Sequence, residues 1–455
     1  MTHKKQIILG AYLGGVNNQT LWGLPEAGSQ IEFSSFEHTA RTAERGKFDF
    51  FFLAEGLALR ERGGKIFDQD IIGRPDTFTV LASLAAVTEH LGLAGTINVT
   101  FNEPYELARQ FASLDHLSGG RAAWNIVTSF DAFTGQNFRR GGFLPRSQRY
   151  ERAAESLALV RELWDSWAED EVVADKGTGQ FVRSGDVGAF QHTGSQFDVH
   201  GRFTLPRSPQ GQPVILQAGV SEQGRDFAAA NSDAIFSPFN HLPEAQEYYS
   251  DIRRRAVAAG RDADDVKLLP GGAFVLGDTD QEAQDKARWV RDQQVTPQTA
   301  RVLLETVWNR DLSDFDPDGP LPTFEPAVDA PSFIQGRARL DSDLQGWADR
   351  LRAVQAEKKL TAREVVVDQF TRTEFVGTPE RVAGQLDDFV QSGGSDGFII
   401  GSHLVPTGLD EFVDRVVPLL QERGSLRAEY QGSTLRDNLG LPVPERRHVR
   451  ASATV

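Results

Sequence analysis

The chain has no cysteine among its 455 residues, and acidic side chains outnumber basic ones. Without cysteine there are no disulfide bonds, no catalytic thiolate and no cysteine-ligated zinc or iron–sulfur centre. The net charge is −16 and no basic stripe runs along the chain. This argues against nucleic-acid binding, because a phosphate backbone selects positively charged surfaces.

Long hydrophobic runs are also lacking. No stretch approaches the roughly 20 apolar residues of a membrane-spanning helix. The apolar run at residues 7–9 is too short for the core of a signal peptide. We therefore expect a cytoplasmic protein that does not act at a membrane. The hydrophobic fraction of 40% is ordinary for a globular protein and supplies a core.

Several short patterns lack the context that their chemistry needs. The stretch from Gly177 to Gly179 has no third glycine and follows no predicted strand, so it is not a dinucleotide-binding fingerprint. Residues 393–397 match G-x-S-x-G, but they follow a predicted helix and precede a strand, which is the reverse of a nucleophile elbow. The nine histidines show no metal-ligand spacing, and we predict no metal site.

What the chain does contain is an alternation of short apolar runs and segments of helical period, which is typical of parallel strands joined by helices. The predicted strands are 7–13, 48–54, 93–100, 121–128, 214–218, 234–237, 266–276 and 397–402. Helical sequence follows each strand, and no glycine-rich phosphate turn follows the first. The pattern predicts an α/β fold, a (β/α)8 TIM barrel with insertion segments.

The alternation is interrupted twice. Residues 169–212 are rich in Gly, Asp and Ser, with only short strand-like pieces such as 196–199, and residues 305–336 are rich in Pro and Asp. Long irregular segments in a compact domain are usually functional, and we expect the second to close over the site. The predicted organisation is one barrel domain over 1–424, with insertions at about 169–212 and 286–345, and a polar C-terminal extension over 425–455.

The active site of a TIM barrel lies at the carboxyl ends of its strands. The predicted strand ends carry mainly hydroxyls and amides, with one carboxylate and no cluster of bases. They include Glu55, 96–102, 128–130, 219–221, Ser237, Ser402 and His403. Such a mouth suits the binding of a polar cofactor better than hydrolysis by acid–base attack.

Residues 103–129, EPYELARQFASLDHLSGGRAAWNIVTS, resemble the signature of the nitrilotriacetate monooxygenase component A group within the bacterial luciferase-like superfamily. That group includes dibenzothiophene sulfone, long-chain alkane and pristinamycin monooxygenases. The resemblance continues in order at FDFFFLAEG, RYERAAE, SPQGQPVILQAGVSEQGRDFAA, VGTPERVA, DGFII and STLRDNLGLP. It therefore covers nearly the whole chain.

The resemblance implies a flavin-dependent monooxygenase that binds reduced FMN without a covalent bond and uses O2 to oxidise or cleave a small organic substrate. A separate NAD(P)H:FMN reductase would supply the reduced flavin, which fits the missing nicotinamide fingerprint. Because the cofactor performs the redox chemistry, the sequence assigns no catalytic residue. Relatives often form homodimers or homotetramers, and we expect one of these states here.

Family flavin contacts carry over onto Glu55, Thr96, Arg146, Tyr150, Val220 and Ser221. Glu55 stands where relatives have Asp, and Arg146 where relatives often have His. Ser221 either binds the flavin phosphate at the start of a helix or is an ordinary helix N-cap. Glu55 either contacts the flavin ring or forms a structural ion pair.

Other interpretations remain open from the sequence. One is an F420-dependent oxidoreductase of the same superfamily, and another is a flavin-binding protein without catalytic activity. A metal-free barrel hydrolase is a third. The aromatic residues Trp22, Phe101, Phe130 and Phe239 suggest a wall for an apolar or aromatic substrate, although aromatic residues also fill cores.

Overall fold

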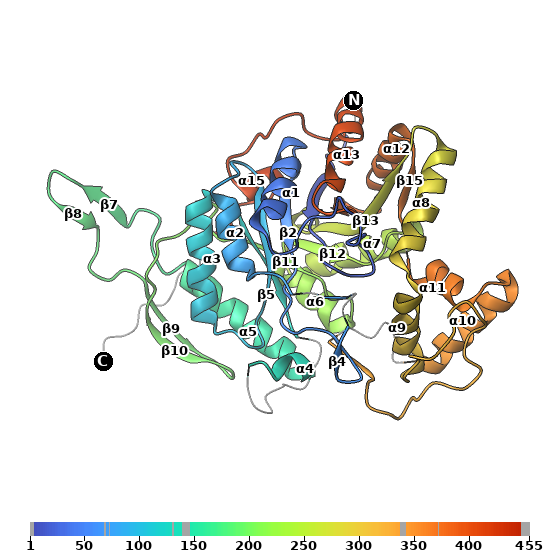
Figure 1. The fold of residues 1–455 in the computed structure, drawn as a ribbon. Helices are drawn as coiled ribbons and strands as arrows, with labels where there is room; N and C mark the ends of the chain where they lie inside the picture. The colour runs from blue at the N-terminus through green and yellow to red at the C-terminus, as the bar shows by residue number, and fades with distance from the viewer. Residues whose placement is uncertain are drawn as a thin grey trace.

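The computed structural model describes residues 4–67, 70–71, 73–129, 132–138, 146–336, 343–371 and 373–446, without the side chains of Ala132, Arg146 and Ser147. At its centre these residues form a closed barrel of parallel strands (Figure 1). In barrel order they are β1 (Ile8–Tyr12), β2 (Phe50–Leu53), β5 (Gly92–Asn98), β6 (Ala122–Val127), β11 (Val214–Gln217), β12 (Ala234–Ser237), β13 (Lys267–Leu276) and β16 (Gly397–Gly401). Pairing of β12 with β13 and of β16 with β1 closes the barrel. All eight predicted strands and the (β/α)8 class are confirmed.

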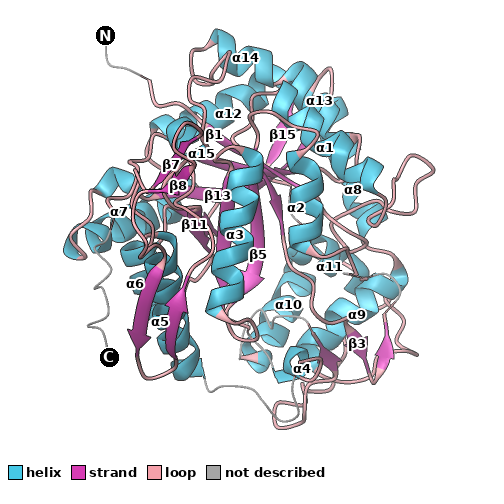
Figure 2. Ribbon diagram, turned by 90° about the vertical axis from the view of Figure 1, so that its left-hand side faces the viewer, coloured by secondary structure: helices cyan, strands magenta, loops and turns pink. Residues whose placement is uncertain are grey.

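Helices cover the outside of the barrel, and Figure 2 shows α2 and α3 over β5. They are α1 (Phe33–Arg45), α2 (Thr77–Ala85), α3 (Pro104–Ser118), α5 (Arg146–Trp164), α6 (Glu222–Asn231), α7 (Leu242–Ala258), α8 (Asp280–Gln294), α12 (Pro379–Gln391), α13 (Gly408–Arg415) and α14 (Val417–Glu422). The four-residue α4 (Ala132–Gly135) lies instead beside Gly336. The strands are apolar without alternation because helices cover one face and the barrel interior the other. Within the described ranges, no helix has the length and apolar character to cross a membrane.

The first insertion consists of two antiparallel hairpins. They are β7 (Val172–Asp175) with β8 (Gln180–Val182), and β9 (Ala189–Thr193) with β10 (Asp198–Arg202). The first hairpin projects from the barrel at the left of Figure 1. Gly179 has a positive φ in its turn, so the stretch from Gly177 to Gly179 belongs to a hairpin turn.

The second insertion builds a helical unit beside the barrel, at the lower right of Figure 1. Its helices are α9 (Pro297–Trp308), α10 (Leu344–Lys358) and α11 (Ala362–Phe370), which pack around buried Leu303, Trp308, Leu351 and Val365. A small sheet of β3 (Glu61–Arg62), β4 (Lys65–Ile66) and β14 (Ile334–Gln335) lies next to the barrel mouth. The chain then returns to the barrel through β15 (Phe375–Gly377), which pairs with β13.

The described part of the segment after residue 424 packs against the barrel at the amino ends of its strands. Helix α15 (Leu435–Leu439) places Leu435, Leu439 and Leu441 in one apolar cluster with the inward residues of the strands. A Cβ at Gly92 would lie 2.6 Å from Leu435 Cδ1, so glycine leaves the space that this leucine fills. Arg436 is buried and donates a hydrogen bond to Asp233 Oδ2 at 2.9 Å.

Candidate active site

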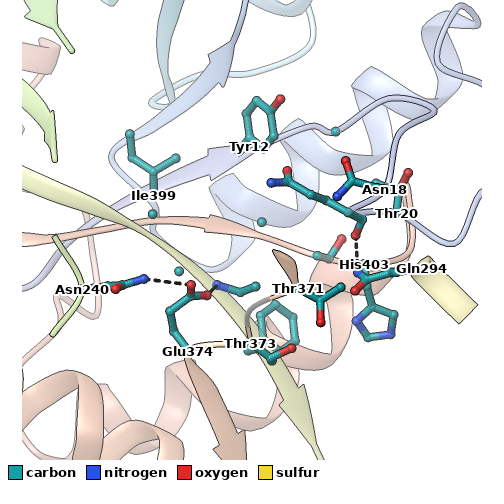
Figure 3. A pocket seen from close by; sticks show the side chains of 18 of the residues that line it. Tyr12, Asn18, Thr20, Asn240, Gln294, Thr371, Thr373, Glu374, Ile399 and His403 are labelled. Carbon is teal, nitrogen blue, oxygen red and sulfur yellow. Dashed lines mark hydrogen bonds between the residues drawn. The ribbon is translucent and has the colours of Figure 1, made fainter. Parts of the chain in front are cut away.

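A cavity of about 500 Å³ opens at the carboxyl ends of the barrel strands (Figure 3). Its walls come from β1, β2, β12, β13 and β16 and from segments that follow strands. Inward-facing Tyr12, Phe52, Phe236, Gly271 and Ile399 form its floor and sides. This is the face at which TIM-barrel enzymes carry their active sites.

One wall of the cavity carries a fixed carboxylate, Glu374, from the segment between α11 and β15. Its Oε1 accepts a hydrogen bond from Asn240 Nδ2 at 2.9 Å, and its Oε2 accepts one from the backbone N–H of Ala273 at 2.8 Å (Figure 3). Because both oxygens are engaged, the carboxylate presents a defined negative charge to any bound molecule.

His403 follows β16 and lines the same cavity with Ser402, as the strand-end analysis predicts. Burial lowers the pKa of His403, and the charge of Lys286 lowers it further, so the imidazole is neutral at pH 7. Within the described part of the chain, its buried Nδ1 has no hydrogen-bond partner. Buried polar atoms are normally satisfied, so this nitrogen is a polar group that the described residues leave unpaired at the cavity.

A second chamber of about 210 Å³ adjoins the cavity and shares four lining residues with it, Tyr12, Asn18, Gln19 and Ala54. Its other walls include Glu55, Arg60 and Arg74. The Oε2 of Glu55 accepts hydrogen bonds from the backbone N–H and the side-chain amide of Asn98, both at 3.1 Å. Burial raises the pKa of Glu55 to about 7 against the lowering effect of these bonds. Among the residues that the structure describes, Glu55 pairs with this amide and forms no ion pair.

Thr96 lies inside the barrel on β5, where it is 8% exposed. Its Oγ1 accepts a hydrogen bond from Asn125 Nδ2 at 2.8 Å. The Oδ1 of Asn125 is buried, and no donor for it exists among the residues that the structure describes. Buried acceptors normally have a donor, so this oxygen is an unsatisfied polar group inside the barrel.

Tyr150 and Ser221 both lie next to Gly224 in the first turn of α6. Ser221 Oγ accepts a hydrogen bond from the backbone N–H of Gly224 at 3.2 Å, which is the N-cap that the sequence allowed. A Cβ at Gly224 would lie 2.9 Å from the Tyr150 hydroxyl oxygen, so the two side chains flank one glycine. Val220, just before the cap, is 44% exposed.

The predicted cofactor residues therefore follow one arc of the barrel mouth, along β2, β5, β6 and β11. Glu55 comes after β2, Thr96 lies on β5, and Val220 and Ser221 come after β11. Tyr150 lies on α5, the helix after β6. Arg146 begins α5, but its side chain lies outside the described residues. Their role in flavin binding stays a prediction.

The aromatic wall differs from the sequence-based hypothesis. Trp22 is 48% exposed, the Phe101 ring stacks on Phe138 at 4.5 Å between centroids, and Phe239 packs on Tyr248 at 4.9 Å. None of these three predicted residues lines the main cavity in the described ranges, and Phe130 lies outside them. The aromatic lining is instead Tyr12, Phe52, Phe236, Phe274 and Phe370.

Period-2 alternation along the strands could have found part of this lining. Phe52 follows Phe50 by two residues on β2, and Phe236 follows Ala234 by two on β12, so each pair faces the barrel interior. The predicted closure by 305–336 is also not observed, because none of these residues lines the cavity. The cavity residues on either side of this segment are Val290, Gln294, Phe370, Thr371, Thr373 and Glu374.

The sequence analysis missed Asn240, Glu374, Arg60 and Arg74. Asn240 and Arg60 lie in segments that follow β12 and β2, and a wider search after each strand would have included them. Glu374 and Arg74 had no local signal. Glu374 reaches the cavity only because α9, α10 and α11 fold as a unit and return the chain to β13.

Comparison with known proteins gives end-to-end matches. The luciferase-like monooxygenase family matches residues 18–396. The chain is 39% identical to N-acetyl-S-(2-succino)cysteine monooxygenase of Bacillus subtilis (strain 168), over 98% of this chain and 99% of that protein. It is 38% identical to dibenzothiophene-sulfone monooxygenase of Rhodococcus erythropolis, over the same shares of the two chains.

Comparison with solved structures gives the same family. The crystal structure of DmoA from Hyphomicrobium sulfonivorans superposes with a TM-score of 0.81 and 31% identity, covering 96% of this chain and 92% of that one. The resemblance inferred from the sequence is thereby confirmed. With a family match over most of its length and relatives aligned from end to end, the chain belongs to the luciferase-like monooxygenases.

Proposed function

We propose that this monooxygenase is the oxygenase component of a two-component system, and that it takes reduced FMN from a separate NAD(P)H:FMN reductase. The observation that carries the proposal is that Tyr150 and Ser221 lie next to the same residue, Gly224, at the start of α6. A helix N-terminus with a hydroxyl on each side suits a phosphate group, because backbone N–H groups and the helix dipole favour negative charge there.

The residues along the arc fit the rest of a flavin. Gly224 keeps the first turn of α6 open, and the unpartnered Oδ1 of Asn125 offers an acceptor beside Thr96. Glu55, with a pKa of about 7, is about half protonated at neutral pH and can donate or accept a hydrogen bond. Arg146 would add a cation for the phosphate. Reduced FMN, when bound, supplies the electrons that activate O2.

The protein's own contribution is binding, orientation and the exclusion of water. The cavity floor is apolar and buried, with Phe52 and Ile399 at 8% and 3% exposure. Glu374 and the neutral His403 provide the polar contacts that would orient a small organic substrate. This division matches a site in which the cofactor performs the redox step.

The family relationship favours FMN over F420, because the relatives that align from end to end are named as monooxygenases. A cytoplasmic location is part of the proposal, since the reductase consumes NAD(P)H. A homodimer or homotetramer remains our expectation for the assembly.

Anaerobic titration of the purified chain tests the proposal. We expect the protein to bind reduced FMN at least ten-fold more tightly than reduced F420 and reduced riboflavin. Under air, substrate oxidation should require NADH, FMN and a flavin reductase together. Preferential binding of F420, or no binding of reduced FMN, would show that the proposed function is wrong.

A further inference from the structure

The second chamber lies across the barrel mouth from the start of α6. It is built on β1 and β2, whereas Val220 and Ser221 follow β11, four strands further around the barrel from β1. A flavin phosphate held at α6 would therefore lie away from this chamber, whose Glu55 is the residue proposed to contact the flavin ring. The chamber and the main cavity share Tyr12 and Ala54, so a molecule in one can extend into the other.

Two arginines line this small chamber in a protein whose net charge is −16. Arg60 donates a hydrogen bond to the buried carboxylate of Asp70, and Arg74 Nη1 donates one to the carbonyl oxygen of Leu13 at 3.1 Å. The Nε atoms of both arginines are buried and lack a hydrogen-bond partner among the described residues. Two guanidinium groups that line one chamber suit an oxyanion, most simply a carboxylate.

Resting on the proposed function, we propose that Arg60 and Arg74 bind a carboxylate of the organic substrate, and that the substrate is consequently a small organic acid. The group to be oxidised would extend into the main cavity past Tyr12. The names of two relatives give one substrate of each kind. One acts on a succino-substituted cysteine, which carries carboxylates, and the other acts on an uncharged sulfone. The raised pKa of Glu55 reduces the negative charge that an incoming carboxylate meets at neutral pH.

Calorimetric titration of the full chain, with and without FMN, tests the inference. The probes are N-acetyl-S-(2-succino)cysteine, nitrilotriacetate and succinate, each paired with its methyl ester. We expect at least one acid to bind ten-fold or more tightly than its ester. Arg74→Gln should weaken that acid by ten- to a hundred-fold and leave the ester unchanged, because it removes a charge-assisted hydrogen bond.

Arg74→Gln is the primary variant because Arg60→Gln would leave buried Asp70 without its cation. Arg60→Lys, which keeps a charge but loses the planar fork, should cause a smaller loss. Arg288→Gln on the exposed face of α8 is the matched control, and melting temperatures verify folding. If no acid binds better than its ester, or if Arg74→Gln leaves acid binding intact, the inference is wrong.

Flavin titrations separate this inference from the proposed function. Intact FMN binding with no preference for acids would overturn only the carboxylate site. Acid binding without FMN binding would overturn the proposed function instead. If Arg74→Gln weakens the binding of FMN but not of riboflavin, the arginines hold the flavin phosphate, and the assignment of a carboxylate site is wrong.

Discussion

The two ends of the barrel interior are built on the same strands but differ in chemistry. The lower interior is the end at the amino termini of the strands, and the upper interior is the end at their carboxyl termini. Near the amino ends, Ile8, Phe50 and Leu269 pack in one apolar cluster with the leucines of α15. The same helix also buries Arg436, which pairs with Asp233. Near the carboxyl ends, Thr96 and Asn125 are also buried, yet they are polar. Strand alternation places both sets on the inward face, so burial alone does not separate them.

The contrast shows where the fold gains stability and where it gives some up for binding. Apolar burial stabilises the lower interior, whereas each buried polar group above needs a hydrogen bond to offset its lost hydration. The unpartnered oxygen of Asn125 and the raised pKa of Glu55 show that this compensation is incomplete. Such groups are not confined to the mouth, because Asp115, Ser232 and Arg427 also carry buried atoms without a partner among the described residues. It is the cavity at the carboxyl ends that locates the ligand site.

Shortening a leucine in the lower interior should give the largest effect on stability. Leu435→Ala removes a side chain that is 1% exposed and leaves a cavity under the barrel. We expect the free energy of unfolding to fall by about 3 kcal/mol in denaturant titrations. Affinity for reduced FMN should stay unchanged, because the lower layer lies at the opposite end from the mouth. A parallel loss of flavin affinity in folded protein would contradict the separation of the two layers.

Glu55→Gln should change how the stability of the protein depends on pH. The change measures the destabilisation caused by ionising this buried carboxyl group. Asn98 can donate to the amide oxygen as it does to Glu55, while Asp76, Arg60 and Arg74 supply the neighbouring charges. The folded pKa of Glu55 is about 7, above the ordinary 4.5, so the folded state holds its proton more tightly. Its stabilising effect is complete below pH 4.5 and is lost as pH rises through 7.

The variant should therefore match wild type at low pH and exceed its stability by up to about 3 kcal/mol at pH 8. Unfolding titrations at several pH values measure this difference. Glu37→Gln on α1, at the outer face, is the control and should show no such trend. A stability difference that does not change with pH would mean that the pKa of Glu55 is the same in the folded and unfolded states.

The same contrast explains how much of the fold the sequence revealed. The barrel strands were all predicted because strands buried on both faces are continuous apolar runs, as in Phe50–Leu53. The sequence from Thr77 keeps a helical period as far as residue 91, which predicts a helix of that length, but helix α2 ends at Ala85. The Oε1 of Glu44 accepts hydrogen bonds from the backbone N–H groups of residues 89–91, and this partner, 45 or more residues away, leaves no local signal.

Local signals did exist for the helices of the second insertion. Thr296 caps α9 with a proline directly after it, and Thr361 forms a capping box with Glu364 at α11. The hairpin strands of the first insertion gave no such signal, because Val172–Asp175 is exposed and has no apolar face. For the site, the strand ends revealed Glu55 and His403, whereas Glu374 depends on how the insertion folds back.

Gly224→Ala gives the smallest expected change in free energy, here in flavin affinity, and separates the two interpretations of the α6 terminus. The added Cβ would lie 2.9 Å from the Tyr150 hydroxyl and 3.1 Å from the Gly219 backbone, so it narrows the space between them. If a flavin phosphate binds there, affinity for FMN should fall about ten-fold, or about 1.4 kcal/mol. Affinity for riboflavin, which has no phosphate, should change little.

Gly384→Ala on α12 provides the matched control, because its Cβ would approach its nearest neighbour, Arg423, only to 3.7 Å. That change should raise stability by about 0.5–1 kcal/mol through helix propensity and leave both flavins unaffected. Fluorescence titration with FMN and riboflavin measures the ratio of affinities directly. An unchanged ratio in Gly224→Ala would assign Ser221 to helix capping alone and would move the phosphate site away from α6.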